Sequence, residues 1–113
     1  MDDKMLELVA EVLRVFGHPL RLKIIELLRG GERCVCEIIP VVGAEQSVVS
    51  KHLAVLKQAG VVDARKEGPR VIYGVRDPAV FAVYDLAQEL VSRRLAELVE
   101  LAADFQVAQE KSG

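Results

Sequence analysis

Two cysteines separated by a single valine have the most distinctive chemistry in this sequence. Cys34 and Cys36 are the only cysteines among its 113 residues. One pair cannot provide the disulfide framework of a small secreted domain, and we expect a bridge across so short a loop to be strained. The sequence therefore predicts a reduced pair of thiols, and thiolates are nucleophiles and ligands of soft ions.

A second group of chemically active residues is polar and basic and lies in the middle of the chain. Between Gln46 and Arg76 there are six basic and two acidic residues, so this segment carries +4 and the rest of the chain −6. Each charge acts over about 8–10 Å at physiological salt, so a basic segment attracts phosphate although the formal net charge is −2. This distribution indicates contact with nucleic acid.

Two amphipathic helices are predicted before the cysteines. Apolar side chains recur at every third or fourth position of residues 2–16, which is typical of an amphipathic helix. Gly17-His18-Pro19 separates this helix from the next, because glycine favours a helix end and proline favours a first turn. The second helix is predicted at about residues 19–28, and we expect His18 to cap or pack there rather than bind metal.

The cysteines begin a predicted pair of short helices. Residues 34–42 are apolar and are interpreted as a short helix, and residues 46–59 as a second helix that Gly60 ends. In the second helix one face is apolar and suited to packing, and the other is polar and basic. The apolar face consists of Val49, Leu53 and Leu56.

A hairpin and a long helix complete the predicted elements. Residues 61–65 alternate loosely, and residues 71–75 are rich in strand formers, with turn residues between the two segments. Asp77 is placed to cap a final helix that begins at Pro78 and has an extended apolar face. Residues 106–113 are predicted to be a frayed tail.

These elements describe one mainly α domain over residues 1–105, with five helices and a β-hairpin. Two short helices followed by a basic hairpin form a winged helix-turn-helix, whose second helix enters the DNA major groove while the hairpin contacts phosphates. The predicted DNA-contacting residues are Gln46, Ser47, Ser50, Lys51, His52, Arg65, Lys66 and Arg70. For His52, a structural hydrogen bond is the alternative to a DNA contact.

Three stretches resemble the ArsR/SmtB family of metal-responsive repressors, and together they cover nearly the whole chain: GHPLRLKIIELLRGGERCVCEI, QSVVSKHLAVLKQAGVV and ARKEGPRVIYGV. The specific pieces are Cys-Val-Cys followed by Glu37, the Gln-Ser-x-x-Ser-x-His-Leu of residues 46–53, and a wing ending in Tyr73. The resemblance implies a homodimer held by its first and last helices and bound to double-stranded, palindromic operator DNA. The long apolar face of the last helix independently favours such a dimer.

By this resemblance to the arsenic-type branch, Cys34 and Cys36 bind trivalent arsenic or antimony, with arsenite or antimonite as the inducer and no obligatory cofactor. Many arsenic-responsive relatives have a third cysteine where this sequence has Ile39. The third ligand is then a small thiol, water or an oxygen side chain. Both histidines precede the last helix, so the zinc-type site that some relatives place there is missing.

The expected mechanism follows from helical geometry. Residues two apart in a regular helix point about 200° away from each other. Gripping one ion with Cys34 and Cys36 should therefore distort the start of the predicted helix 34–42 and release DNA. The inducer can weaken DNA binding only as far as it prefers the unbound conformation.

Several other functions compete with this interpretation. A winged-helix repressor could respond to thiol oxidation or to another thiophilic ion, and a protein-interaction module could use the same fold without DNA. An enzyme is not expected, because the sequence has no glycine-rich phosphate loop and no recognisable catalytic carboxylate pair. Pairing Cys34 with His52 as nucleophile and base would need residues that the predicted helices use otherwise.

Export and membrane insertion are not predicted. The first residues are acidic and show no small-residue cleavage site, unlike a secretory signal. The longest uncharged stretches have seven residues, whereas a membrane-spanning helix needs about 20 apolar ones. The sequence therefore predicts a cytoplasmic protein.

Overall fold

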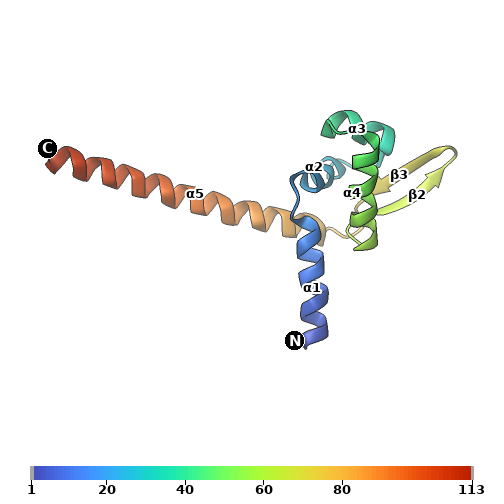
Figure 1. The fold of residues 1–113 in the computed structure, drawn as a ribbon, viewed down its shortest axis with the longest axis horizontal. Coiled ribbons are helices and arrows are strands. Elements are labelled where there is room, and N and C mark those ends of the chain that lie inside the picture. The colour runs from blue at the N-terminus through green and yellow to red at the C-terminus, as the bar shows by residue number, and fades with distance from the viewer. Residues whose placement is uncertain (1, 113) are drawn as a thin grey trace. The chain divides into compact units, whose positions relative to one another are not determined.

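A computed structural model describes residues 2–112 of the chain. Residues up to Phe81 form one compact unit, and residues from Ala82 onward form a second. The elements are α1 (Asp3–Phe16), α2 (Pro19–Leu28), β1 (Arg33–Cys34), α3 (Val35–Val42), α4 (Gln46–Gln58), β2 (Asp63–Glu67), β3 (Arg70–Gly74) and α5 (Ala79–Ser112), as Figure 1 shows. The predicted winged helix-turn-helix with five helices is confirmed.

Side chains at the junctions fix where the first two helices begin. The Asp2 carboxylate accepts a hydrogen bond of 2.8 Å from the Met5 amide, which caps α1. The Nδ1 atom of His18 accepts a bond of 3.1 Å from the Leu20 amide and caps α2, whose first residue is Pro19. The predicted capping role of His18 is confirmed.

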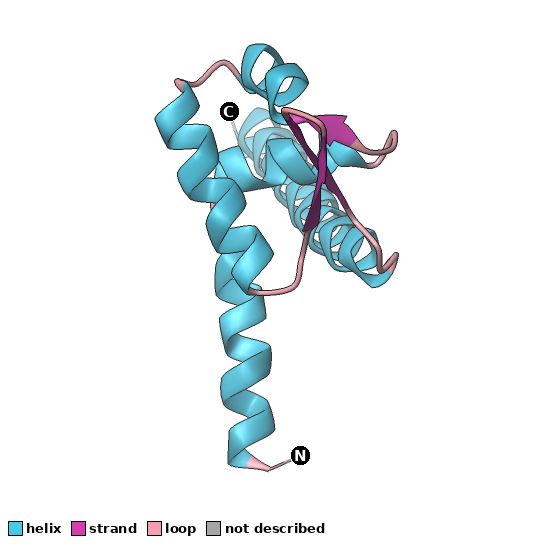
Figure 2. Ribbon diagram, turned by 90° about the vertical axis from the view of Figure 1, so that its right-hand side faces the viewer, coloured by secondary structure: helices cyan, strands magenta, loops and turns pink. Residues whose placement is uncertain are grey.

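The helix-turn-helix consists of α3 and α4 and is joined by a tight turn. Gly43 ends α3 with φ 71°, a left-handed conformation that glycine adopts without strain. Gly60 has φ 78° and follows α4, as predicted. Figure 2 shows the chain turning from the end of α4 directly into β2.

The wing belongs to a sheet with one more strand than the sequence predicts. Strands β2 and β3 pair as an antiparallel hairpin whose two-residue loop begins with Gly68 at φ 62°. Strand β1 pairs with the other edge of β3, so the order is β1-β3-β2. Strand β2 begins at Asp63 rather than at residue 61, because the amides of Val61 and Val62 donate to the Leu56 carbonyl of α4.

The core of the first unit lies among α2, α3 and α4. Its six largest fully buried side chains are Ile24, Ile25, Ile38, Val49, Leu53 and Leu56. The last three come from α4, and they are the residues whose helical spacing predicts an apolar face. Full burial of such side chains contributes about 1.5–3 kcal/mol each, so α4 is firmly anchored.

The final helix is longer than predicted. Asp77 Oδ1 accepts a bond of 2.9 Å from the Ala79 amide and caps α5, as predicted. The helix continues to Ser112 through the segment 106–112, where the sequence analysis expects a frayed tail. This segment contains good helix formers and neither glycine nor proline. None of the helices within residues 2–112 is long and apolar enough to cross a membrane.

Candidate nucleic-acid interface and cysteine site

The two faces of α4 differ sharply in exposure. Val49, Leu53 and Leu56 are fully buried and hold the helix against the core. The exposed face presents amide, hydroxyl and ammonium groups, which are the donors and acceptors that contact base edges and phosphates. Its exposed predicted residues are Gln46, Ser47, Ser50 and Lys51.

His52 lies on the packed side of α4. Its surface is 9% exposed, and its Nδ1 atom accepts a bond of 3.1 Å from Arg21 Nε. Its ring centroid is 4.3 Å from that of His18. Burial lowers the pKa of His52, and electrostatic interactions with His18, Arg21 and Lys51 lower it further. Of the two roles predicted for His52, this geometry favours the structural hydrogen bond over the DNA contact.

The basic residues of the wing differ in how they are paired. Arg65 Nε lies 3.1 Å from a Glu32 carboxylate oxygen, and Arg65 also donates to Glu67. The hydrogen bonds that Arg65 donates, first to Glu67 and then to Glu32, raise the pKa of Arg65. Lys66 is exposed near the tip of the hairpin. Two carboxylates therefore offset the charge of Arg65, which is one of the two wing arginines predicted to contact phosphate.

The structure corrects the expectation of a reduced thiol pair, because a disulfide joins Cys34 and Cys36. The predicted helix at residues 34–42 begins one residue later, at Val35. Cys34 therefore has the extended backbone of a strand residue, with φ −66° and ψ 149°, while Cys36 lies in the first turn of α3. The 200° separation expected within a helix does not apply, and the two sulfur atoms meet without unwinding α3.

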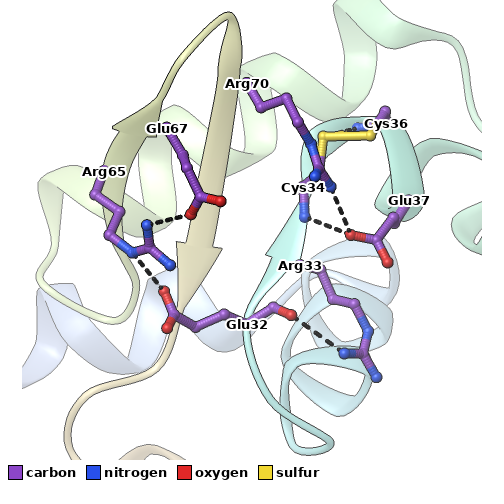
Figure 3. A network of polar contacts seen from close by, with 8 residues as sticks. All are labelled: Glu32, Arg33, Cys34, Cys36, Glu37, Arg65, Glu67 and Arg70. Atoms are coloured by element: carbon purple, nitrogen blue, oxygen red, sulfur yellow. Dashed lines mark hydrogen bonds and ion pairs between the residues drawn. A yellow bond between two sulfur atoms is a disulfide. The ribbon is translucent and has the colours of Figure 1, made fainter.

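Glu37 links this cysteine site to the wing. Its Oε1 atom accepts a bond of 3.0 Å from the Cys34 amide and a bond of 3.3 Å from the Arg70 guanidinium. Figure 3 shows Arg70 reaching from the wing to the start of α3, beside the disulfide. Cys34 is also paired with Ile72 across the sheet. The cysteine site and the wing are thus connected through both backbone and side chains.

A cavity of about 520 Å³ adjoins the cysteine pair. One wall contains Cys34 and Cys36, a second contains Gln46 and Ser50 of α4, and a third contains Arg70 and Tyr73 of β3. The buried Cys34 sulfur accepts a bond of 3.1 Å from the Cys36 amide, whereas Cys36 is exposed. The structure therefore brings predicted thiol ligands and predicted DNA contacts to one hollow.

Sequence reasoning missed the contacts that join these groups. The two-residue strand β1 is too short to produce an alternating pattern, so its pairing with the wing gives no sequence signal. The Glu37–Arg70 pair joins residues 33 positions apart. A glutamate three residues after a helix-capping residue does indicate a capping box, and this signal could have identified Glu37 as the partner of the Cys34 amide.

The fold and the exposed basic surface define a winged helix-turn-helix DNA-binding regulator. The sequence profile described as "Bacterial regulatory protein, arsR family" matches residues 18–64. An HTH-type transcriptional regulator of Methanocaldococcus jannaschii is 44% identical over 85 residues, which is 74% of this chain and 96% of that protein. The protein therefore belongs to the arsR family of bacterial regulatory proteins, and it is a DNA-binding transcriptional repressor of this family.

Two further similarities concern assembly and metal response in relatives. The solution structure of a homodimeric winged helix-turn-helix DNA-binding domain from Mycobacterium bovis is 33% identical, with a TM-score of 0.75, and the match covers 84% of this chain and 91% of that one. A "Probable mercury resistance operon repressor" of Streptomyces lividans is 36% identical over 89 residues, 79% of this chain and 71% of that protein. Both support the family assignment.

Proposed function

We propose that the protein represses transcription as a cytoplasmic homodimer on a palindromic operator and is released when trivalent arsenic or antimony binds Cys34 and Cys36. It acts by binding alone, with no catalytic step and no obligatory cofactor. One observation carries the proposal. Two cysteines meet at the junction of β1 and α3, in a hollow whose other walls contain predicted DNA contacts.

The DNA-binding part of the proposal rests on α4 and the wing. Gln46 and the serines on the exposed face of α4 suit base edges and phosphates, and Lys51, Lys66 and Arg70 suit phosphates. Arg65 would contact phosphate only after exchanging Glu32 or Glu67 for it. A two-fold dimer would present two copies of α4 about 34 Å apart, one turn of the DNA helix.

The apolar faces of the first and last helices support a dimer. In α1 five large apolar side chains between Met5 and Leu13 are 40–54% exposed. In α5 Leu86, Leu90, Val91 and Leu95 are each more than half exposed, and the face continues to Phe105. Apolar surface on this scale marks an interface, and the homodimeric relative makes a second copy of the chain its occupant.

The metalloid part of the proposal concerns the reduced protein. Thiolates, and not disulfide sulfurs, bind soft ions, so the disulfide must first be reduced. The extended backbone at Cys34 already places both side chains on one side of the chain. A relative named for mercury resistance supports a response to a thiophilic ion.

Release of DNA would follow the contacts of Glu37 and β1. A bound ion would displace the sulfur of Cys34. The Cys34 amide donates a hydrogen bond to Glu37, and the Cys34 backbone pairs with β3. Any shift at Cys34 therefore changes the position of Arg70 and of the wing. The core side chains of α4 do not take part in these contacts, so the wing is expected to move first.

Fluorescence anisotropy of labelled DNA from upstream of the protein's own gene tests this proposal. The reduced native chain and a Cys34→Ser/Cys36→Ser variant are each titrated with arsenite. The native protein is expected to dissociate, whereas the variant is expected to bind DNA equally well and to ignore arsenite. Equal release of both proteins, or retention of both, would contradict the metalloid assignment.

Thiol oxidation is a second candidate signal, and the disulfide itself favours it. Here reduction and oxidation of Cys34 and Cys36, rather than an ion, would set the position of β1 and the wing. The same DNA is titrated with reduced and with oxidised native protein in the absence of arsenite. A difference in affinity that vanishes in the double serine variant would support this candidate, and equal affinities would exclude it.

A further inference from the structure

The cavity beside the cysteine pair has the lining of a small-molecule site. We propose that it binds a low-molecular-weight thiol carrying carboxylates, and that this thiol supplies the third sulfur ligand of the metalloid held by Cys34 and Cys36. The inference rests on the proposed function and names the form in which the inducer is bound. It depends on the space, the donors and the charge around the two sulfur atoms.

The chain does not offer a third thiol of its own. Cys34 and Cys36 are its only cysteines. The nearby Glu37 carboxylate already accepts bonds from the Cys34 amide and from Arg70, so using it as a ligand would break the cap of α3. Arsenous acid and three thiols give three arsenic–sulfur bonds and three water molecules, with no change of oxidation state. Two of these thiols come from the protein and the third from solution.

The cavity has room for such a molecule. Its volume of about 520 Å³ lies within the roughly 300–1,000 Å³ of ordinary ligand sites. Cys36 forms the exposed side of the pair, so an ion held there is accessible from the cavity. Arg70 and Tyr73 of β3 also line it. A thiol of a few carbon atoms therefore fits between the wing and the recognition helix.

The charge of the lining selects an acidic thiol. Arg70 borders the cavity and is half exposed, and its guanidinium is shared with Glu37 at 3.3 Å. The amide of Gln46 and the hydroxyl of Ser50 add hydrogen-bond donors on the facing wall. Arginine pairs with carboxylates more strongly than with neutral groups, because the bonds are charge-assisted.

Occupation of this cavity would oppose DNA binding directly. The thiol would lie against Gln46, Ser50 and Arg70, three of the predicted DNA contacts. Its carboxylates would bring negative charge to the surface that meets phosphate. The inducer complex would then act both by moving the wing and by covering part of the reading surface.

The test measures arsenite binding to the reduced full-length protein without DNA, in a neutral phosphine reductant that contains no sulfur or carboxylate. Arsenite is titrated with 2-mercaptoethanol or with mercaptosuccinate, and native mass spectrometry records the bound species. The expected product contains one arsenic and one mercaptosuccinate for each protein chain of the dimer. For each protein we take the ratio of its apparent arsenite affinity with mercaptosuccinate to that with 2-mercaptoethanol. This ratio is compared among native protein, Arg70→Met and Arg76→Met. Binding of arsenic to free thiol in solution is the same for all three and therefore cancels.

Arg70→Met is expected to lower the preference for mercaptosuccinate about tenfold, the factor of one charge-assisted hydrogen bond. Arg76→Met removes the same charge from a residue outside the cavity lining and should leave the preference unchanged. Arsenite bound without a thiol, or an equal preference in all three proteins, would overturn this inference and leave the proposed function intact. Absence of arsenite binding under every condition would overturn both.

Discussion

The recognition helix and the wing are held in the protein by different forces. Val49, Leu53 and Leu56 fix α4 through fully buried apolar surface. Among the described residues the hairpin strands add one large side chain, Ile72, to the buried core, and their polar contacts with the preceding chain include the exposed ion pairs Arg65–Glu32 and Arg70–Glu37. Exposed ion pairs contribute about 0–1 kcal/mol each, less than one buried leucine. The backbone pairing of β3 with β1 adds only two residue pairs.

This difference fits the proposed division of roles, in which α4 reads DNA and the wing responds to the cysteine site. A helix that must present the same side chains to the DNA bases in every complex benefits from a rigid anchor. A wing that must respond to the state of Cys34 benefits from weak contacts that change at small cost. The cysteine site lies on the weakly held side, because Cys34 belongs to β1 and its amide is bound by Glu37.

The largest effect on stability is expected when the buried side chains that anchor α4 are shortened. Leu53→Ala removes a fully buried side chain and should lower the free energy of unfolding by about 2–5 kcal/mol. Val48→Ala lies on the same helix at 40% exposure and should change it far less. Urea unfolding followed by circular dichroism measures both variants. Similar losses in the two would show that α4 is not anchored by its buried face.

A smaller effect is expected from the polar contact between α4 and α2. Burial lowers the pKa of His52, so the folded state binds a proton less readily than the unfolded state. The stability contributed by the neutral ring is present above about pH 6.5 and is lost as the pH falls through the lowered pKa. The midpoint of urea unfolding should therefore fall on acidification below pH 6.5.

His52→Asn keeps an acceptor near Arg21 but cannot titrate, so its midpoint should depend less on pH in this range. His18→Asn preserves the cap of α2 and removes the other histidine as the matched control. If His18→Asn removed the pH dependence and His52→Asn kept it, the assignment to His52 would be wrong.

The smallest effect on stability is expected in the wing. Glu67→Gln weakens the pair with Arg65 and should change the free energy of unfolding by less than about 1 kcal/mol. Its effect on DNA should be clearer, because loss of a carboxylate frees Arg65 for phosphate and removes a repelling charge. Anisotropy titrations should show tighter binding and a steeper dependence on salt. Unchanged or weaker binding would place Arg65 away from the DNA.

The same contrast explains what the sequence could predict. The apolar spacing of α4 identifies Val49, Leu53 and Leu56 as core residues, because burial of one helix face imposes a repeat on the sequence. The start of α2 at Pro19 and the cap of α5 at Asp77 were predictable as well, since caps act through neighbouring residues. Elements held by local or periodic interactions were therefore correctly predicted.

Features that depend on contacts between residues far apart in the sequence were not predicted. Strand β1 exists because two residues pair with β3, almost 40 positions along the chain. This pairing sets the backbone of Cys34, and with it the meeting of the two sulfurs that the sequence analysis expected to point apart. Burial of His52 likewise depends on Arg21 of α2 and on His18, the residue that caps α2. None of these contacts leaves a repeat in the sequence.

Amide hydrogen exchange of the reduced protein with and without arsenite tests the central claim that the cysteine site acts on the wing and leaves α4 anchored. We expect arsenite to change the protection of β1, β2, β3 and the first turn of α3, and to leave the buried residues of α4 unchanged. The Cys34→Ser/Cys36→Ser variant should show no change. Altered protection along α4 with an unaffected wing would contradict the account.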